Sequence, residues 1–117
     1  MVRSTWAALT ADLPPADLAL FEAYRTACAA LPDTEERVHT TEVQYAVKRI
    51  FTAGYLKSHW LEVSIDLLRE AEHPLLRAVF PTTKRVFTHR LTLGEPSQVD
   101  SIMDLVREAH DQVGPGT

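Results

Sequence analysis

One histidine of this sequence lies within a strand pattern whose other side chains on the same face are apolar, where it could act in acid–base chemistry. In "KRVFTHRLTL", His89 shares one side of the predicted strand with Phe87 and Leu91. A neutral, desolvated imidazole can act as a general base or hold a ligand, and Glu62 or Tyr45 would assist it. The competing interpretation is a structural histidine. A ring sealed in the core with both nitrogens bonded to the backbone would rule out the catalytic hypothesis.

A second set of chemically capable side chains lies on the polar face of the strand pattern "SHWLEVSIDLL". The polar side chains that share this face or could align with it across a sheet are Trp60, Glu62, Ser64, Asp66, Gln44, Lys48, Thr88 and Arg90. Trp60 could stack a ring, Arg90 and Lys48 could hold an anion, and Glu62 could accept a hydrogen bond, with His59 at the adjacent turn. The alternative is a solvated face with cross-strand ion pairs, each worth about 0.2–1 kcal/mol.

Several common active-site constellations are missing from the sequence. Glycine occurs only at positions 54, 94, 114 and 116, which leaves no glycine-rich phosphate loop and no GxSxG nucleophile elbow. No histidine pair has the spacing of a zinc motif, and the single cysteine, Cys28, excludes an intramolecular disulfide and a cysteine zinc site. We therefore expect neither a metal nor a nucleotide cofactor.

Two helices are predicted to flank the strands that carry these residues. The segment 14–31 begins with two prolines, has Asp17 in its first turn and repeats apolar residues with a 3.6-residue period. The segment 96–113 begins after Gly94 and carries an apolar stripe from Val99 to Val113. Residues 114–117 are expected to be a frayed tail.

Residues 37–93 between the helices are predicted to form an antiparallel sheet. Apolar residues alternate with polar ones in "VQYAVKR", "SHWLEVSIDLL" and "KRVFTHRLTL", as in sheets with one buried and one wet face. Lys57–His59 reads as a turn between two strands, and prolines at 74 and 81 bound a short helical insert near 70–80. The chain is thus predicted to be a single α+β domain over 1–117. It would be a two-layer sandwich in which four to five strands carry both helices on one face.

The charge is spread unevenly along the chain, which has a net charge of −4. Residues 37–93 contain nine basic and five acidic side chains, whereas both flanking segments are acidic. A basic middle segment favours a small anionic ligand, while the acidic flanks disfavour nucleic acid. No apolar run is long enough to span a membrane and no signal peptide is recognisable, so we expect a cytoplasmic protein. Nine arginines against three lysines suggest a GC-rich bacterial genome.

The sequence resembles a known family along most of its length. The runs "RVHTTEVQYAVKRIFTAGYLKSHWLEVSIDL", "FTHRLTL" and "VDSIMDLVREAHDQV" are similar to domain-of-unknown-function family 5655, over roughly residues 15–113. The signals are Thr40 and Thr41 on an entry strand, Phe51, a strand of "LEVSIDL" type, and His89 before a C-terminal helix. The resemblance implies a small bacterial domain of this fold type and supplies no catalytic residues.

Two functions from different classes therefore stay open. The first is a small binding or interaction module that recognises an anionic or aromatic ligand, or a protein partner, on the open face of the sheet. The second is a cofactor-free enzyme in which His89 performs acid–base chemistry. Self-pairing into a homodimer through a sheet edge or the open face is compatible with both.

Overall fold

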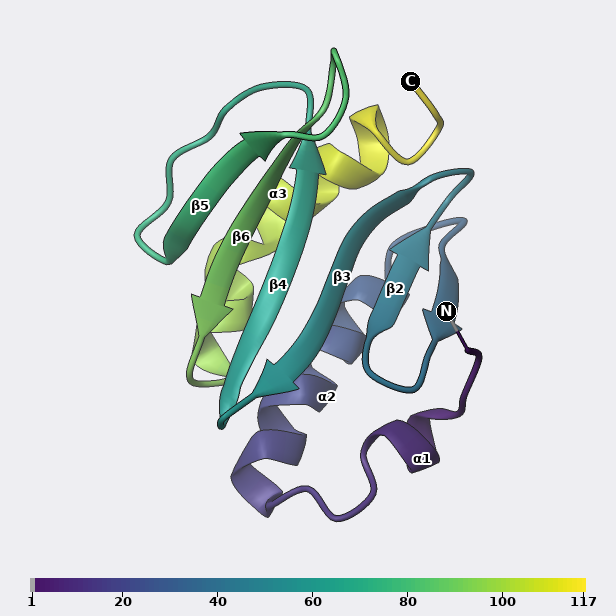
Figure 1. The fold of residues 1–117 in the computed structure, drawn as a ribbon, viewed down its shortest axis with the longest axis vertical. Coiled ribbons are helices and arrows are strands. Elements are labelled where there is room, and N and C mark those ends of the chain that lie inside the picture. The colour runs from purple at the N-terminus through teal and green to yellow at the C-terminus, as the bar shows by residue number, and fades with distance from the viewer. Residues whose placement is uncertain (1) are drawn as a thin grey trace.

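The computed structural model describes residues 2–117. Its fold is α+β, with an antiparallel sheet and three helices, which confirms the predicted fold class (Figure 1). The elements in chain order are α1 (Trp6–Leu9), α2 (Pro15–Ala29), β1 (Glu35–Val38), β2 (Val43–Ala46), β3 (Ile50–Lys57), β4 (Trp60–Leu67), β5 (Leu76–Pro81), β6 (Phe87–Leu93) and α3 (Ser97–Gln112).

The sheet has six strands in the order β1-β2-β3-β4-β6-β5, so the prediction of four to five strands was wrong. Both extra strands lie at the edges. β1 is only four residues long, too short for its alternation to be recognised. β5 occupies residues 76–81, where a short helical insert was predicted, and Val79 is paired with His89 of β6. Proline is tolerated in an edge strand, so Pro81 does not prevent pairing.

One face of the sheet is buried against helices. In Figure 1, α2 and α3 lie behind the strands, and both helices contact β3 and β4. Leu61, Val63, Ile65 and Leu67 of β4 point to this side and are at most 2% exposed. Burial of each such side chain contributes about 1.5–3 kcal/mol, so the strict alternation of β4 also fixes which face of the sheet meets the helices.

The β3–β4 connection is the turn predicted from Lys57–His59. Ser58 and His59 have φ angles of 50° and 70°. Two successive residues with positive φ are typical of a type I′ turn, whose twist matches that of the flanking strands. Because the ring of His59 bonds to the carboxylate of Asp17 at 2.7 Å, the turn is tied to the first turn of α2.

The segment after α3 is docked, contrary to the prediction of a frayed tail. The carbonyl oxygen of Gly114 accepts hydrogen bonds from the amides of Lys48 and Arg49, at 2.8 and 2.9 Å. Val113 and Gly114 are buried. These bonds hold the end of α3 against the β2–β3 turn. Within residues 2–117, the helices are all too short or too polar to cross a membrane.

Candidate functional site

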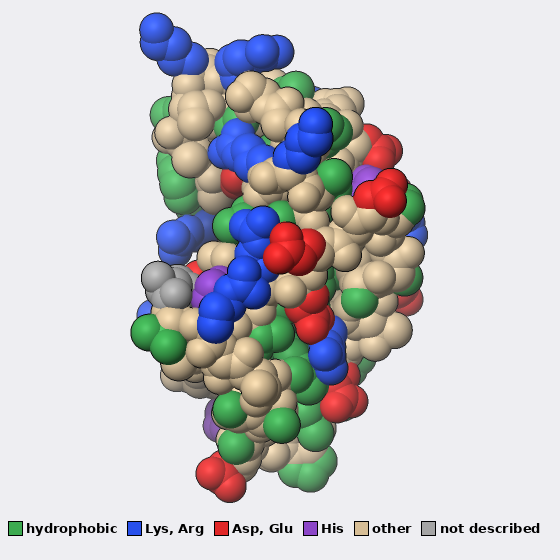
Figure 2. All heavy atoms as spheres, turned by 90° about the vertical axis from the view of Figure 1, so that its right-hand side faces the viewer, with side chains coloured by type: hydrophobic (Ala, Val, Ile, Leu, Met, Phe, Trp, Pro, Cys, Tyr) green, Lys and Arg blue, Asp and Glu red, His purple; other side chains and the backbone are tan. Residues whose placement is uncertain are grey.

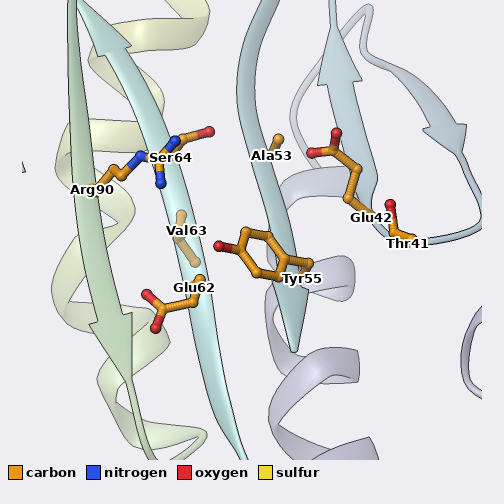
Figure 3. Close-up of a pocket in the computed structure, with 8 residues that line it drawn as sticks. All are labelled: Thr41, Glu42, Ala53, Tyr55, Glu62, Val63, Ser64 and Arg90. Atoms are coloured by element: carbon orange, nitrogen blue, oxygen red, sulfur yellow. The ribbon is translucent and has the colours of Figure 1, made fainter. Parts of the chain in front are cut away.

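The sheet face opposite the helices carries a hollow of about 340 Å³ (Figure 3). The residues that line it are Thr41, Glu42, Ala53, Tyr55, Glu62, Val63, Ser64 and Arg90. Figure 3 shows Arg90 beside Ser64 at one end, Tyr55 reaching toward Glu62 at the other, and Glu42 with Thr41 on the far side. Its volume falls within the range of small-molecule sites, about 300–1,000 Å³.

Strand register produces this hollow. Ala53 of β3 pairs with Ser64 of β4, which in turn pairs with Arg90 of β6. One step along the same face, Tyr55 pairs with Glu62. The small side chains of Ala53 and Ser64 leave a low floor, and the larger side chains around them form the walls. The shape therefore follows from two small residues placed opposite each other on adjacent strands.

Arg90 is the basic group of the hollow. Its guanidinium carbon lies 5.6 Å from the centre of the Phe80 ring on β5, a cation–π contact that holds the side chain on the open face. Within residues 2–117, no carboxylate forms an ion pair with Arg90. Ser64 pairs directly with Arg90 and Glu62 lies diagonally across, at a separation of about 7–8 Å for such neighbours. An anionic group could therefore bind to Arg90 without displacing a partner from this part of the chain.

Two carboxylates supply acceptors around the hollow. Oε2 of Glu62 accepts a hydrogen bond from the Thr92 hydroxyl at 2.7 Å, which fixes this side chain and leaves its other oxygen for a ligand. Oε1 of Glu42 accepts from the Gln44 amide at 3.3 Å. The Tyr55 hydroxyl has no hydrogen bond to any other residue in the described range. The hollow is thus lined by two carboxylates, one guanidinium and the hydroxyl-bearing residues Thr41, Tyr55 and Ser64.

The position of Glu42 depends on a chain of side chains on β2 and its loop. Because a carboxylate only accepts, the amide nitrogen of Gln44 must face Glu42, and its oxygen must then face His39. Nε2 of His39 lies 2.8 Å from that oxygen and therefore carries a hydrogen. His39 is buried, and its backbone amide donates to the Glu42 carbonyl at 2.8 Å. These contacts brace the wall of the hollow that β2 provides.

The end of the open face near the β2–β3 turn is occupied by internal contacts. The Asp66 carboxylate accepts from the Thr88 hydroxyl at 2.7 Å and lies 3.5 Å from the guanidinium of Arg49. Thr88 also bonds to Thr82. Burial raises the pKa of Asp66 above its usual range, although Thr88 and Arg49 oppose this effect. Asp66 is therefore less available for a ligand than Glu62.

The predicted ligand-binding residues are only partly brought together. Arg90 and Glu62 line the hollow, but Trp60, Lys48 and His59 do not. Trp60 lies at the start of β4 beside Gly94 and is half exposed. Lys48 is exposed in the β2–β3 turn, at the opposite end of the sheet from Trp60, roughly 20 Å away by the rise of the strand. His59 bonds to Asp17 instead of facing the hollow.

Lys48 lies outside the hollow, in the β2–β3 turn at the upper end of the sheet in Figure 1. Figure 2, a view onto the right-hand side of Figure 1, shows Lys and Arg side chains gathered toward the upper end of the molecule, with acidic side chains among and below them. This is the end at which Arg49 pairs with Asp66. The structure does not bring Lys48 into the hollow that Arg90 lines. A register shift between Tyr45 and Ala46 turns the end of β2 away from the regular alternation.

His89 is held entirely by backbone groups. The ring is fully buried, and Nε2 accepts a hydrogen bond from the Ala71 amide at 2.8 Å. Nδ1 must then carry the hydrogen, which it directs to the carbonyls of Phe87 and Ile65 at 3.1 and 3.3 Å. This is the arrangement that the sequence analysis set as the condition against catalysis. Neither ring nitrogen is left for a substrate.

The other two residues of the catalytic hypothesis lie apart from His89. Glu62 is on the open face, while His89 pairs with Ile65 and points to the helices. Tyr45 also points into the core, where its hydroxyl donates to a carboxylate oxygen of Glu36 at 2.8 Å. Burial and the bond to Glu36 raise the pKa of Tyr45 well above its ordinary value. The structure therefore does not assemble these three residues into one site.

Two polar residues of the hollow, Tyr55 and Glu42, were not singled out from the sequence. Tyr55 follows the alternation of β3, two positions after Ala53, and its place opposite Glu62 would follow from a β3–β4 register set by a two-residue turn. Glu42 lies in the β1–β2 connection, for which the sequence offers no comparable signal. Within residues 2–117, no three side chains of the metal-ligating types cluster.

Comparison with known proteins identifies the family. A family model described as Domain of unknown function (DUF5655) matches residues 7–113. The chain therefore belongs to this family, which confirms the resemblance found in the sequence. No curated protein and no solved structure matches the chain significantly. A functional conclusion accordingly depends on the geometry of the site.

Proposed function

We propose that this member of the DUF5655 family is a small binding module that takes an anionic ligand in the open-face hollow. The observation that carries the proposal is Arg90, which lines the hollow, stacks over Phe80 and has no carboxylate partner within residues 2–117. A planar guanidinium of this kind suits two parallel hydrogen bonds to a carboxylate. The unpaired Arg90 is thus the anchor of the proposed site.

The other residues that line the hollow limit which anionic ligands it can bind. Glu62 and Glu42 would repel a second anionic group and accept hydrogen bonds from amino or hydroxyl groups. The Tyr55 ring offers an apolar surface and a hydroxyl. The best match is a small carboxylate that carries at least one hydrogen-bond donor, such as an amino acid or a hydroxy acid. Large polyanions fit less well because two carboxylates border the hollow.

The proposal also includes where the module acts. A single buried cysteine and the excess of arginine over lysine support a role in the cytoplasm of a bacterium. No observation favours the enzyme alternative. His89 is enclosed by backbone partners, and burial raises the pKa of the Cys28 thiol to about 12, so neither is poised for reaction.

An amide NMR titration tests this function. Labelled protein would be titrated with amino acids, hydroxy acids, simple carboxylates and nucleotides. We expect shifts at Ser64, Arg90 and Tyr55 for a carboxylate of the proposed class. Arg90→Gln should weaken binding about 10–100-fold, because a hydrogen bond to a charged group contributes about 1.5–3 kcal/mol.

Lys57→Gln is the matched control, because Lys57 is an exposed cation at the end of β3 that does not line the hollow. It should bind the carboxylate as well as the parent protein does. Equal weakening by both substitutions would mean that general charge, not the hollow, attracts the ligand. A spectrum indifferent to the whole panel would overturn the proposal and leave the exposed Trp60 as the anchor for a protein partner.

A further inference from the structure

The two edges of the sheet differ in how they are protected. At the β1 edge, the N-terminal segment runs alongside: Arg3 forms a bridge with His39, and the Ser4 amide donates to the Val38 carbonyl at 2.9 Å. At the other edge, β5 pairs only with β6 and forms the outer strand in Figure 1. The β4–β5 loop seen beside it is held against α3, where Arg69 bonds to Glu108. β5 is therefore the open edge.

The pairing pattern shows which groups of β5 point outward. The Thr82 amide donates to the Val86 carbonyl, and Phe80 is opposite Thr88 two positions further on. Since hydrogen-bonded pairs alternate in an antiparallel ladder, Phe80 faces β6 as Thr82 does, and the amide and carbonyl of Val79, the residue before Phe80, point away from β6. Pro81 takes the next outward position, where no amide hydrogen is lost from the ladder. An added strand could hydrogen-bond to Val79.

This edge also concentrates unpaired positive charge. Residues 73–94 contain the four cations Arg77, Lys84, Arg85 and Arg90 and no aspartate or glutamate. None of the four forms an ion pair with another residue in the part of the chain that the structure describes. Phe80, 38% exposed, is one of the few large apolar side chains on the surface. Residues 73–94, which contain β5, β6 and the turn between them, are called the basic hairpin below. Its positive charge contrasts with the net charge of −4 of the whole chain.

We propose that the outer edge of β5 docks an acidic, extended segment of a partner protein, which joins the sheet as a further antiparallel or parallel strand. Backbone hydrogen bonds at Val79 would hold the strand, while Arg77, Lys84 and Arg85 would select acidic side chains. The same charge opposes self-pairing, because a second copy would bring its own Arg77 to this edge.

A peptide explains these features better than a nucleic acid does. Sheets that bind single-stranded nucleic acid present several aromatic side chains for successive bases, whereas Phe80 is the sole exposed aromatic residue among residues 73–94. The edge instead offers backbone donors and acceptors in the geometry that a strand requires. This inference does not rest on the hollow, and none of its test residues lines it.

The test uses the full chain and a defined probe. A fluorescein-labelled peptide of about eight residues, in which glutamate alternates with threonine, suits a strand of ordinary length. We expect saturable anisotropy changes at low salt and protection of the Val79 amide from hydrogen exchange. The triple variant Arg77→Glu/Lys84→Glu/Arg85→Glu should bind about tenfold more weakly or worse. Lys57→Glu, at an exposed turn remote from β5, is the matched control and should bind normally.

A second probe keeps the test independent of any variant. A peptide of the same sequence, N-methylated at alternate residues so that it cannot complete a ladder, should bind at least about tenfold more weakly. Equal binding of the methylated and unmethylated peptides would overturn the proposal. Stronger binding of an oligothymidylate of equal charge would also overturn it, in favour of a nucleic-acid surface. If Lys57→Glu weakened peptide binding as much as the triple variant does, the binding would be due to non-specific charge attraction, and the docking proposal would be refuted.

Discussion

His89→Ala should be one of the most destabilising single substitutions in this chain. It removes the ring that accepts from the Ala71 amide at 2.8 Å and donates to the carbonyls of Phe87 and Ile65. A buried amide without a partner costs about 1–3 kcal/mol, and the cavity left by the side chain adds to that cost. We therefore expect a loss of about 3–5 kcal/mol, a large share of the 5–15 kcal/mol that stabilises an ordinary domain.

His73 provides the control substitution for His89→Ala within the same chain. His73 makes the same kinds of bond, since Nδ1 accepts from the Leu75 amide at 3.0 Å and Nε2 donates to the Ser101 carbonyl at 2.8 Å. His73 is half-buried rather than sealed. Water can replace its partners, so His73→Ala should cost only about 0.5–1.5 kcal/mol.

Urea unfolding followed by circular dichroism would measure both losses under the same conditions. The difference between the two losses in unfolding free energy isolates the effect of burial, because the two histidine rings make similar hydrogen bonds. His89→Gln, whose amide can replace one of the bonds, should fall between the two. A loss for His89→Ala no larger than that for His73→Ala would refute the account of His89 as a structural residue. It would also reopen the catalytic hypothesis.

Two further predictions concern packing and pH. Gly54→Ala would place a Cβ 2.7 Å from Cε2 of Tyr24, so overpacking should cost about 1–3 kcal/mol in thermal or urea unfolding; an unchanged stability would show that the ring can move aside. His110 faces two acceptors, Asp111 at 2.8 Å and the Pro32 carbonyl at 2.6 Å. Its burial lowers its pKa, but these two bonds outweigh that effect and raise the pKa above 6.5. The stabilisation is thus fully present below pH 6.5 and is lost as pH rises through the folded pKa. Urea midpoints measured between about pH 5.5 and 8.5 should show this loss, and His110→Gln should flatten it.

The regular parts of the fold could be predicted from the sequence because their patterns are long. Eight residues of strict alternation define β4, and a helical period over fifteen residues defines α2. The two edge strands were not predicted from the sequence, because β1 has only four residues and β5 is interrupted by a register shift near Leu76. Their pairing is decided by contacts with β2 and β6, which no local pattern encodes.

The sequence could place residues of the hollow only where the pattern of a single strand sufficed. Glu62 and Arg90 lie on the wet faces of clearly alternating strands, and the antiparallel register brings them to the same hollow. Lys48 does not line the hollow, and the irregularity after Tyr45 breaks the alternation from which its position was predicted. His59 does not line the hollow either, because a turn with positive φ carries its ring toward Asp17. Irregular backbone and non-local contacts therefore account for the positions that the sequence pattern alone could not predict.

The strand order β4-β6-β5 has a consequence for how the chain reaches this structure. Every other pairing in the sheet joins strands that follow each other directly, so these hairpins close short loops and can form quickly. The pairing of β4 with β6 must instead enclose residues 68–86, and the entropy of that closure is lost before the contacts form. If β5 and β6 first form their own hairpin, less chain remains to be ordered. We therefore expect the basic hairpin to join a preformed β1–β4 meander as a unit and to open as a unit in native-state hydrogen exchange.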